Sequence, residues 1–186
     1  MNRKIFPAVP RATTEYGLSV LHHDLWDLHK LGYIIGITIN LGVKKNGENV
    51  MGCGCAKEAA QRFPSLPRLV GESNQVLWNE HPNLKQQIKK DMWDEQMMRS
   101  CCSFYPRLRL FTFPVKYDWN QPADTCLIQY SAWWLDLMVR AWEDYTIYLP
   151  KPGCGAGGLS WEKVAKSLRH YRVKNLIFVD YPKGKE

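Results

Sequence analysis

Apolar residues along this chain follow two spacings, one typical of β-strands and one typical of helices. The clearest strand pattern lies at residues 33–40, where isoleucines make a nearly continuous β-branched run. Such a run is typical of a central strand covered on both faces. Shorter strand patterns lie at residues 18–22, 107–115, 146–149 and 175–181. The sequence therefore predicts a sheet in which residues 33–40 form a central strand.

Between these predicted strands, apolar residues recur at helical spacing. One helical stretch runs from Ala56 to Phe63 and ends at Pro64. A second, longer stretch spans residues 127–142, and a third follows Ser160, which is a good N-cap. Strands that alternate with helices predict an α/β sandwich with mostly parallel strands. Ligands of such sheets bind beyond the carboxyl ends of the strands.

The chain of 186 residues has the length of one domain. Residues 1–17 show no clear period and are interpreted as an N-terminal arm, which leaves residues 18–186 as a single domain. Within that domain, residues 72–105 mix tryptophan and methionine with charged residues in a helical pattern, which indicates an insertion. The insertion either adds cover to the core or forms a lid, and we favour core cover.

Two glycine-rich stretches, residues 50–56 and 149–159, each follow a predicted strand and precede a predicted helix. Glycines let the backbone approach a ligand, and a helix N-terminus offers free N–H groups and partial positive charge. The first stretch lacks the third glycine of a dinucleotide-binding fingerprint, and neither has the Gly-Lys-Ser/Thr of a P-loop. The pair predicts a cleft that grips a diphosphate from both sides, and hence a nucleotide-sized ligand.

The formal net charge of +7 suits an anionic ligand or a nucleic acid, but a solvated basic surface explains it equally well. The six cysteines have neither a secretory context nor the spacing of a zinc site. We therefore expect reduced thiols in a cytoplasmic protein, and no bound metal. No apolar run approaches the length of a membrane span, and the basic N-terminus lacks the apolar core of a signal peptide. We expect no membrane partner.

Four features of the sequence belong together: Asn40 at the end of the central strand, the Val-Met-Gly-x-Gly-x-Ala run of residues 50–56, the Phe-Pro-x-Lys motif of residues 113–116, and the Leu-Pro-x-x-Gly-Cys-Gly-x-Gly-Gly-Leu-x-Trp motif of residues 149–161. Together they resemble the motifs of macrodomains, a family of ADP-ribose-binding modules. The resemblance extends over residues 18–180. It is closest to the branch that holds the DNA-ADP-ribose-removing antitoxins and their phage and bacterial relatives.

This resemblance implies a three-layer α/β/α macrodomain fold with a helical insertion, built around a mixed, mostly parallel sheet of roughly six strands. We expect a monomer that needs no cofactor, although no feature of the sequence indicates the oligomeric state. The implied location is the cytoplasm, which is that of the host cell if a phage encodes the protein. The implied partner is ADP-ribose or an ADP-ribosylated substrate.

Individual positions take roles from the resemblance. Asp24, with Leu25 beside it, would accept the adenine amino group, whereas from the residues alone Asp24 is a turn or helix-cap residue. Asn40 would hydrogen-bond the distal ribose without adding charge beside the phosphates. The glycine-rich stretches would hold the ribose and the diphosphate through Met51, Gly52, Cys53, Gly54 and Cys55 on one side and Pro152, Gly153, Cys154, Gly155, Ala156, Gly157 and Gly158 on the other.

The resemblance implies that Lys116, the lysine of the Phe-Pro-x-Lys motif, is catalytic together with Asn40. A lysine beside an apolar strand end can act as a base or a nucleophile. The alternative is a surface lysine that follows a strand and pairs with Asp118 or Asp124.

The implied function is ADP-ribose binding with hydrolysis of an ADP-ribosyl linkage on nucleic acid or protein. A related animal enzyme uses a lysine in the first helix and an aspartate in the second glycine-rich stretch. Ala60 and Gly157 stand at these positions here, so that chemistry is not expected. Two alternatives stay open. One is a non-catalytic binder or sequesterer of ADP-ribose or of a signal nucleotide derived from it, and the other is a phosphatase for ADP-ribose 1″-phosphate.

Overall fold

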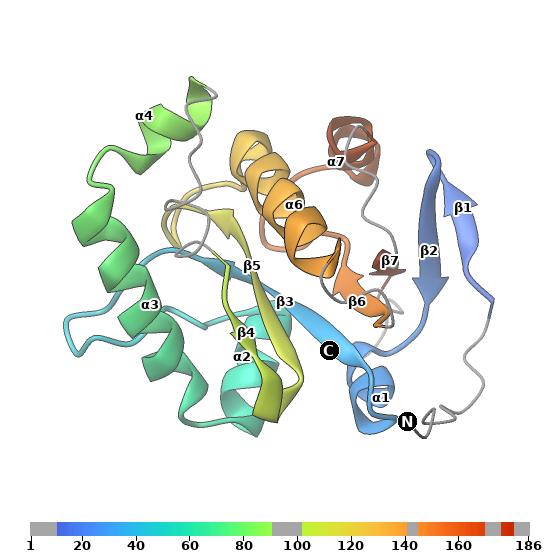
Figure 1. The fold of residues 1–186 in the computed structure, drawn as a ribbon, viewed down its shortest axis with the longest axis horizontal. Helices are drawn as coiled ribbons and strands as arrows, with labels where there is room; N and C mark the ends of the chain where they lie inside the picture. The colour runs from blue at the N-terminus through green and yellow to red at the C-terminus, as the bar shows by residue number, and fades with distance from the viewer. Residues whose placement is uncertain (1–10, 91–101, 141–144, 170–175, 181–186) are drawn as a thin grey trace.

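The fold is built on one mixed sheet with the strand order β1-β2-β7-β6-β3-β5-β4 (Figure 1). The computed structural model describes residues 11–90, 102–140, 145–169 and 176–180. The strands are β1 (Thr13–Glu15), β2 (Leu18–His22), β3 (Ile34–Asn40), β4 (Phe104–Tyr105), β5 (Leu110–Lys116), β6 (Ile147–Pro150) and β7 (Leu176–Asp180).

The five inner strands β2, β7, β6, β3 and β5 run parallel, while β1 and β4 pair antiparallel at the two edges. This pattern confirms the mixed, mostly parallel sheet, with seven strands among the described residues instead of roughly six. The predicted central strand is β3, which lies between β6 and β5. The additional edge strand β1 falls within residues 1–17, which the sequence analysis assigned to an arm.

Helices cover both faces of the sheet. On one face, α1 (Leu25–Lys30) and α2 (Gly54–Arg62) pack with alternate side chains of β3. On the other face, α6 (Thr125–Arg140) packs on β5, and α4 (Leu84–Lys89) and α7 (Trp161–Leu168) pack against α6. Because β3 and β5 are buried on both faces, the three-layer α/β/α prediction is confirmed.

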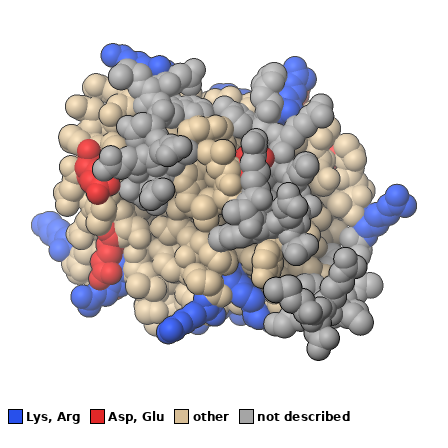
Figure 2. All heavy atoms as spheres, viewed as in Figure 1, with Lys and Arg blue, Asp and Glu red and all other residues tan. Residues whose placement is uncertain are grey.

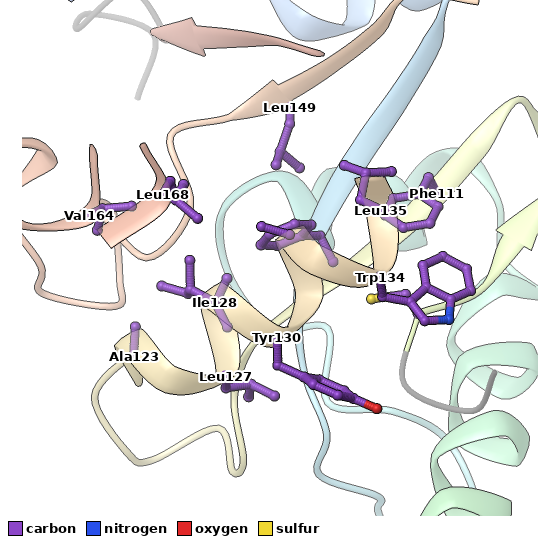
Figure 3. Close-up of a cluster of buried hydrophobic side chains, with 14 of the residues drawn as sticks. Phe111, Ala123, Leu127, Ile128, Tyr130, Trp134, Leu135, Leu149, Val164 and Leu168 are labelled. Carbon is purple, nitrogen blue, oxygen red and sulfur yellow. The ribbon is translucent and has the colours of Figure 1, made fainter. Parts of the chain in front are cut away.

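The larger of the two cores lies under α6. Figure 3 shows side chains of this core around α6, with Trp134 beside Phe111 of β5. These two rings are stacked, with centroids 5.5 Å apart and planes inclined by 24°. The described part of the aromatic face that the sequence predicts on this helix is therefore core, as the helical spacing indicates, while residues 141–142 of the predicted stretch lie outside the described residues.

The insertion predicted at residues 72–105 is partly helical in the described residues. It contains most of α3 (Leu66–Glu80), which begins six residues before the predicted start, and all of α4. Leu77, Leu84 and Ile88 are buried in the core under α6. Residues 91–101 of the predicted insertion lie outside the described residues. Its described part therefore contributes core cover.

Two further elements differ from the sequence prediction. The strand predicted from residue 107 begins at Leu110, because Pro106–Leu108 forms a 3₁₀ turn that ends at Arg109 in a left-handed conformation, φ 50°. Helix α1 was not predicted, since six residues are too few for a helical period to stand out. In contrast, Ser160 caps α7 as predicted, where its Oγ accepts the Lys163 N–H at 3.3 Å.

No helix in the described part of the chain combines the length and the apolar character needed to cross a membrane.

Candidate functional site

A β-bulge brings Asn40 and Lys116 side by side at the carboxyl ends of β3 and β5. The register pairs Ile39 with Pro114 and then Asn40 with Lys116, so Val115 is the additional residue. Pro114 has no N–H to donate to a ladder, and proline inside a sheet is typical of bulges. The bulge therefore sets the two residues that the resemblance marks as catalytic next to each other.

A cleft of about 620 Å³ opens beyond the carboxyl ends of β3, β5, β6 and β7, which is the edge where parallel sheets bind ligands. Its volume falls within the range of pockets for nucleotide-sized ligands. Its wall contains eleven of the predicted site residues: Asn40, Gly52, Cys53, Gly54, Cys55, Lys116, Gly153, Cys154, Gly155, Ala156 and Gly157. Both glycine-rich stretches therefore face one cleft.

The first glycine-rich stretch is held to the end of β3 by asparagine side chains. Asn40 donates its Nδ2 hydrogen to the Val50 carbonyl at 2.7 Å, and its Oδ1 accepts the Gly42 N–H at 2.9 Å. Fully buried Asn49 donates to the Asn40 and Gly42 carbonyls at 2.8 and 2.7 Å. Asn74 of α3 also donates to the Asn40 carbonyl, at 3.3 Å. The amide of Asn40 thus anchors the loop as well as lining the cleft.

The N-terminus of α2 opens into the cleft. Cys53 is its N-cap and forms no side-chain cap hydrogen bond, while Gly54 adopts φ +55°. The first N–H groups of an α-helix have no intrahelical acceptor. Those of Gly54 and Cys55, two cleft residues, are therefore available to an anion.

The second glycine-rich stretch closes on itself through backbone hydrogen bonds. The Leu159 N–H donates to the Gly153 carbonyl, and the Gly158 N–H donates to the Gly155 carbonyl, both at 3.0 Å. Gly153 and Gly158 each have φ +74°, a conformation that L side chains rarely adopt. The turn therefore depends on glycine at these two positions.

Lys116 connects the β3–β5 bulge to this second stretch. Its Nζ donates to the Ala156 carbonyl at 2.7 Å across the cleft. The two carboxylates of the alternative pairing have other contacts: Asp118 accepts the Trp119 N–H, and Asp124 accepts the Cys126 N–H. The hydrogen bond of Lys116 in this structure is thus to the glycine-rich loop.

The glycines of the two stretches differ in whether an added methyl group would fit, and this difference gives a prediction. A Cβ at Gly157 would collide with the Gly153 carbonyl and lie 2.8 Å from Ala123 Cβ, whereas a Cβ at Gly52 or Gly155 meets nothing within 4 Å. We expect Gly157→Ala to cost about 1–3 kcal/mol, which lowers Tm by roughly 2–12 °C in differential scanning fluorimetry.

The matched controls are Gly52→Ala and Gly155→Ala. We expect these to leave Tm nearly unchanged, because each methyl group enters open space on the cleft wall. An equal loss of stability in all three variants would contradict the distinction.

Lys151 forms a partly buried ion-pair cluster at the opposite end of the cleft. Its side chain is 12% exposed, with Nζ 3.0 Å from Glu15 and 2.9 Å from Asp180. Burial alone would lower the pKa of Lys151, but the contacts with Asp180 and Glu15 outweigh burial and raise it. The cluster keeps the lysine charged where the second stretch leaves β6.

Glu15, His22 and Asp180 are the described residues whose ligand atoms are close enough to hold a metal, within 4.8 Å of one another. Both carboxylates already contact the Lys151 ammonium group, so a metal ion would have to displace that contact. The arrangement is therefore that of a salt-bridge cluster.

Two of the cleft cysteines are poor nucleophiles. Burial raises the pKa of the Cys55 thiol, and burial raises the pKa of Cys154 to about 11. A thiol rather than a thiolate is then the dominant form at neutral pH, and the thiolate is the reactive form. These residues serve as small neutral parts of the wall.

Five predicted site residues do not line the cleft. Asp24 is the N-cap of α1, where Oδ1 accepts the Trp26 N–H at 2.7 Å and the Asp27 N–H at 3.3 Å. Its adenine contact stays a prediction. The other four are Leu25 and Met51, which are buried in the core, Pro152, which is buried, and Gly158, which is exposed.

The cleft also contains residues that the sequence analysis did not select, among them Glu58, Trp119, Lys151 and Asp180. Trp119 could have been considered, since it follows the Phe-Pro-x-Lys motif by three residues. Lys151 could have been selected together with the second glycine-rich stretch, within which it lies. Asp180 could not, because the sequence gives no reason to place the end of the last strand beside that stretch.

The sheet order, the two covered faces and the cleft with its two glycine-rich walls define the macrodomain fold. Three solved structures share this fold, and each is 18–21% identical to this chain. No protein-family model and no curated protein matches the chain.

The first of these structures is Thermosipho africanus DarTG in complex with ADP-ribose, with a TM-score of 0.62 and 19% identity over 91% of this chain and 42% of that one. The second is the macrodomain of Thermus aquaticus DarG, with a TM-score of 0.58 and 21% identity over 88% of this chain and 97% of that one. The third is the macrodomain of Mycobacterium tuberculosis DarG, with a TM-score of 0.57 and 18% identity over 90% of this chain and 100% of that one.

Proposed function

We propose that this protein binds ADP-ribose and hydrolyses an ADP-ribosyl linkage on nucleic acid or protein. The observation that carries the proposal is the bulge that sets Asn40 against Lys116 between two glycine-rich walls of one cleft. The likeness to a DarTG structure in complex with ADP-ribose supports the choice of ligand.

In this proposal the diphosphate lies between the two glycine-rich stretches. The first-turn N–H groups of α2 face it from one side, and the backbone of residues 153–157 faces it from the other. Neither side requires a charged side chain, since helix N-termini and oriented backbone amides bind anions by themselves. The distal ribose then lies against Asn40 and Lys116 at the β3–β5 end.

The proposed reaction breaks the bond between C1″ of the distal ribose and the atom of the attached group. Water supplies the new hydroxyl on C1″, and its second proton goes to the departing atom, so the products are ADP-ribose and the unmodified partner. The transition state has oxocarbenium character, and its stabilisation depends on groups held in position before the reaction. Lys116 Nζ acts at this bond, and Asn40 keeps the first loop in register.

A binding-only role is the second candidate, and the hydrogen bonds of the site favour it. The Asn40 amide donates to the Val50 carbonyl and accepts from the Gly42 N–H, and Lys116 donates to the Ala156 carbonyl. If these contacts persist in the complex, both side chains support the walls and neither touches the scissile bond. The protein would then sequester ADP-ribose or a nucleotide derived from it.

The distribution of charged side chains on the surface bears on whether the modified partner is a nucleic acid or a protein. On the face of the molecule seen in Figure 2, the Lys and Arg side chains of the described residues lie scattered around the outline and do not gather in one patch. Nucleic-acid binding through a broad phosphate-contact surface would need such a patch on another face.

Calorimetry and product analysis test the proposal together. We expect ADP-ribose to bind, AMP to bind more weakly because it lacks the diphosphate and the distal ribose, and ADP-ribose to be released from ADP-ribosylated DNA or protein. Binding without release after long incubation would favour the sequesterer. Free phosphate from ADP-ribose 1″-phosphate would favour the phosphatase, and absence of ADP-ribose binding would overturn all three.

A further inference from the structure

Trp119 stands out among the apolar side chains of the described residues. It is 60% exposed, more than any other large hydrophobic residue among them, and it lines the cleft. Exposing an indole to water forgoes the free energy of burying a large apolar surface. Ligand pockets are commonly lined by aromatic side chains, so an exposed indole at the wall of a cleft is placed to contact a ligand there.

The backbone beneath Trp119 is fixed. Its N–H donates to Asp118 Oδ1 at 2.6 Å, and the Gln121 N–H donates to the Asp118 carbonyl at 3.3 Å, which closes a turn around Trp119. The Leu41 N–H donates to the Lys116 carbonyl at 2.9 Å, so the start of this loop is tied to the end of β3. The indole is thus carried on a backbone that is held in place before a ligand arrives.

The position of Trp119 relative to the proposed reaction gives it a role. It follows Lys116 by three residues, on the β5 side of the cleft, while Lys151 and Asp180 belong to the β6 and β7 side. If the distal ribose lies against Asn40 and Lys116, the group attached to C1″ continues from there toward the β5 loop. Trp119 is the aromatic member of the cleft wall in that direction.

We propose that Trp119 is a specificity-determining residue that stacks on the group attached to C1″ of the distal ribose and favours a planar group there. This inference rests on the proposed function and deepens it. Indole faces stack on flat π systems and gain less from a puckered aliphatic ring of similar size. The side chain thus selects by the shape of the departing group, while the glycine-rich stretches bind the part that all substrates share.

Two ligands of matched size test the proposal. They are carbon-linked analogues of ADP-ribose that bear a phenyl or a cyclohexyl ring on C1″, so hydrolysis cannot occur. We expect wild type to bind the phenyl analogue about tenfold more tightly than the cyclohexyl analogue, a preference typical of one stacking contact. Trp119→Ala should reduce that ratio to nearly one, Trp119→Phe should keep most of it, and Trp119→Leu should not.

Tyr145→Ala is the matched control, since Tyr145 is exposed to a similar degree and does not line the cleft. This variant should keep the wild-type ratio. A wild-type ratio near one, or an unchanged ratio in Trp119→Ala, would overturn the role of Trp119 and leave the proposed function standing. Failure of wild type to bind ADP-ribose itself would overturn the proposed function, and this inference with it.

Discussion

Replacing Lys116 with alanine should lower the turnover of ADP-ribosylated substrate by at least about 100-fold, the usual loss when one group acting at the reacting bond is removed. Lys116 is the cation that the β3–β5 bulge sets opposite Asn40, on the wall that the distal ribose would contact. Single-turnover release of ADP-ribose, followed by mass spectrometry, measures the effect directly. ADP-ribose affinity in the same variant separates loss of chemistry from loss of binding.

Alanine removes the hydrogen bond from Lys116 Nζ to the Ala156 carbonyl as well as the charge, so a second variant is needed to separate the two effects. Lys116→Gln keeps an N–H donor but no charge. If the charge acts at the reacting bond, glutamine should be nearly as inactive as alanine. If only the hydrogen bond to the Ala156 carbonyl matters, Lys116→Gln should recover most of the turnover rate.

Lys163→Ala provides a comparison, since Lys163 is exposed on α7 and lies outside the cleft. Its turnover should equal that of wild type. Equal turnover in Lys116→Ala would exclude Lys116 from the reaction.

Replacing Asn49 with aspartate should destabilise the fold by about 3 kcal/mol or more. The Asn49 amide is fully buried, and its Nδ2 lies 2.8 Å from the Asn40 carbonyl and 2.7 Å from the Gly42 carbonyl. A carboxylate would place an anionic oxygen against two acceptors and bury a charge without a partner. Thermal unfolding should therefore show a Tm roughly 6–12 °C lower.

Asn46→Asp is the matched control for this change. Asn46 is exposed in the turn, and its Oδ1 accepts the Glu48 N–H at 3.2 Å, a role that a carboxylate retains. Its Tm should stay close to that of wild type. A similar Tm in both variants would show that the asparagine network does not hold the first glycine-rich stretch.

Much of the architecture could be predicted because its signals are local. The β-branched run of β3, the aromatic face of α6 and the Ser160 cap each depend on neighbours within one element. The edge strand β1 and helix α1 were missed because three and six residues carry too little periodicity. Their place is set by pairing and packing with distant segments.

The candidate site likewise contains residues that local motifs predicted and residues that they did not. The glycine-rich stretches and the pair of Asn40 and Lys116 were expected from motifs, and the structure places them around one cleft. Asn49 gave no signal, since a sequence does not reveal that an asparagine between a turn and a loop is fully buried. The contact between Lys151 and Glu15 spans 136 positions and depends entirely on the tertiary fold.

The antiparallel pairing of β1 with β2 determines where the chain can be shortened. A truncated protein that starts at Leu18 would lose Glu15 and with it one of the two carboxylates on Lys151. It would also leave the backbone N–H and C=O groups along one side of β2 without their strand partner. An exposed edge strand of this kind can pair with strands of other molecules, so the shortened protein would be prone to self-association and aggregation.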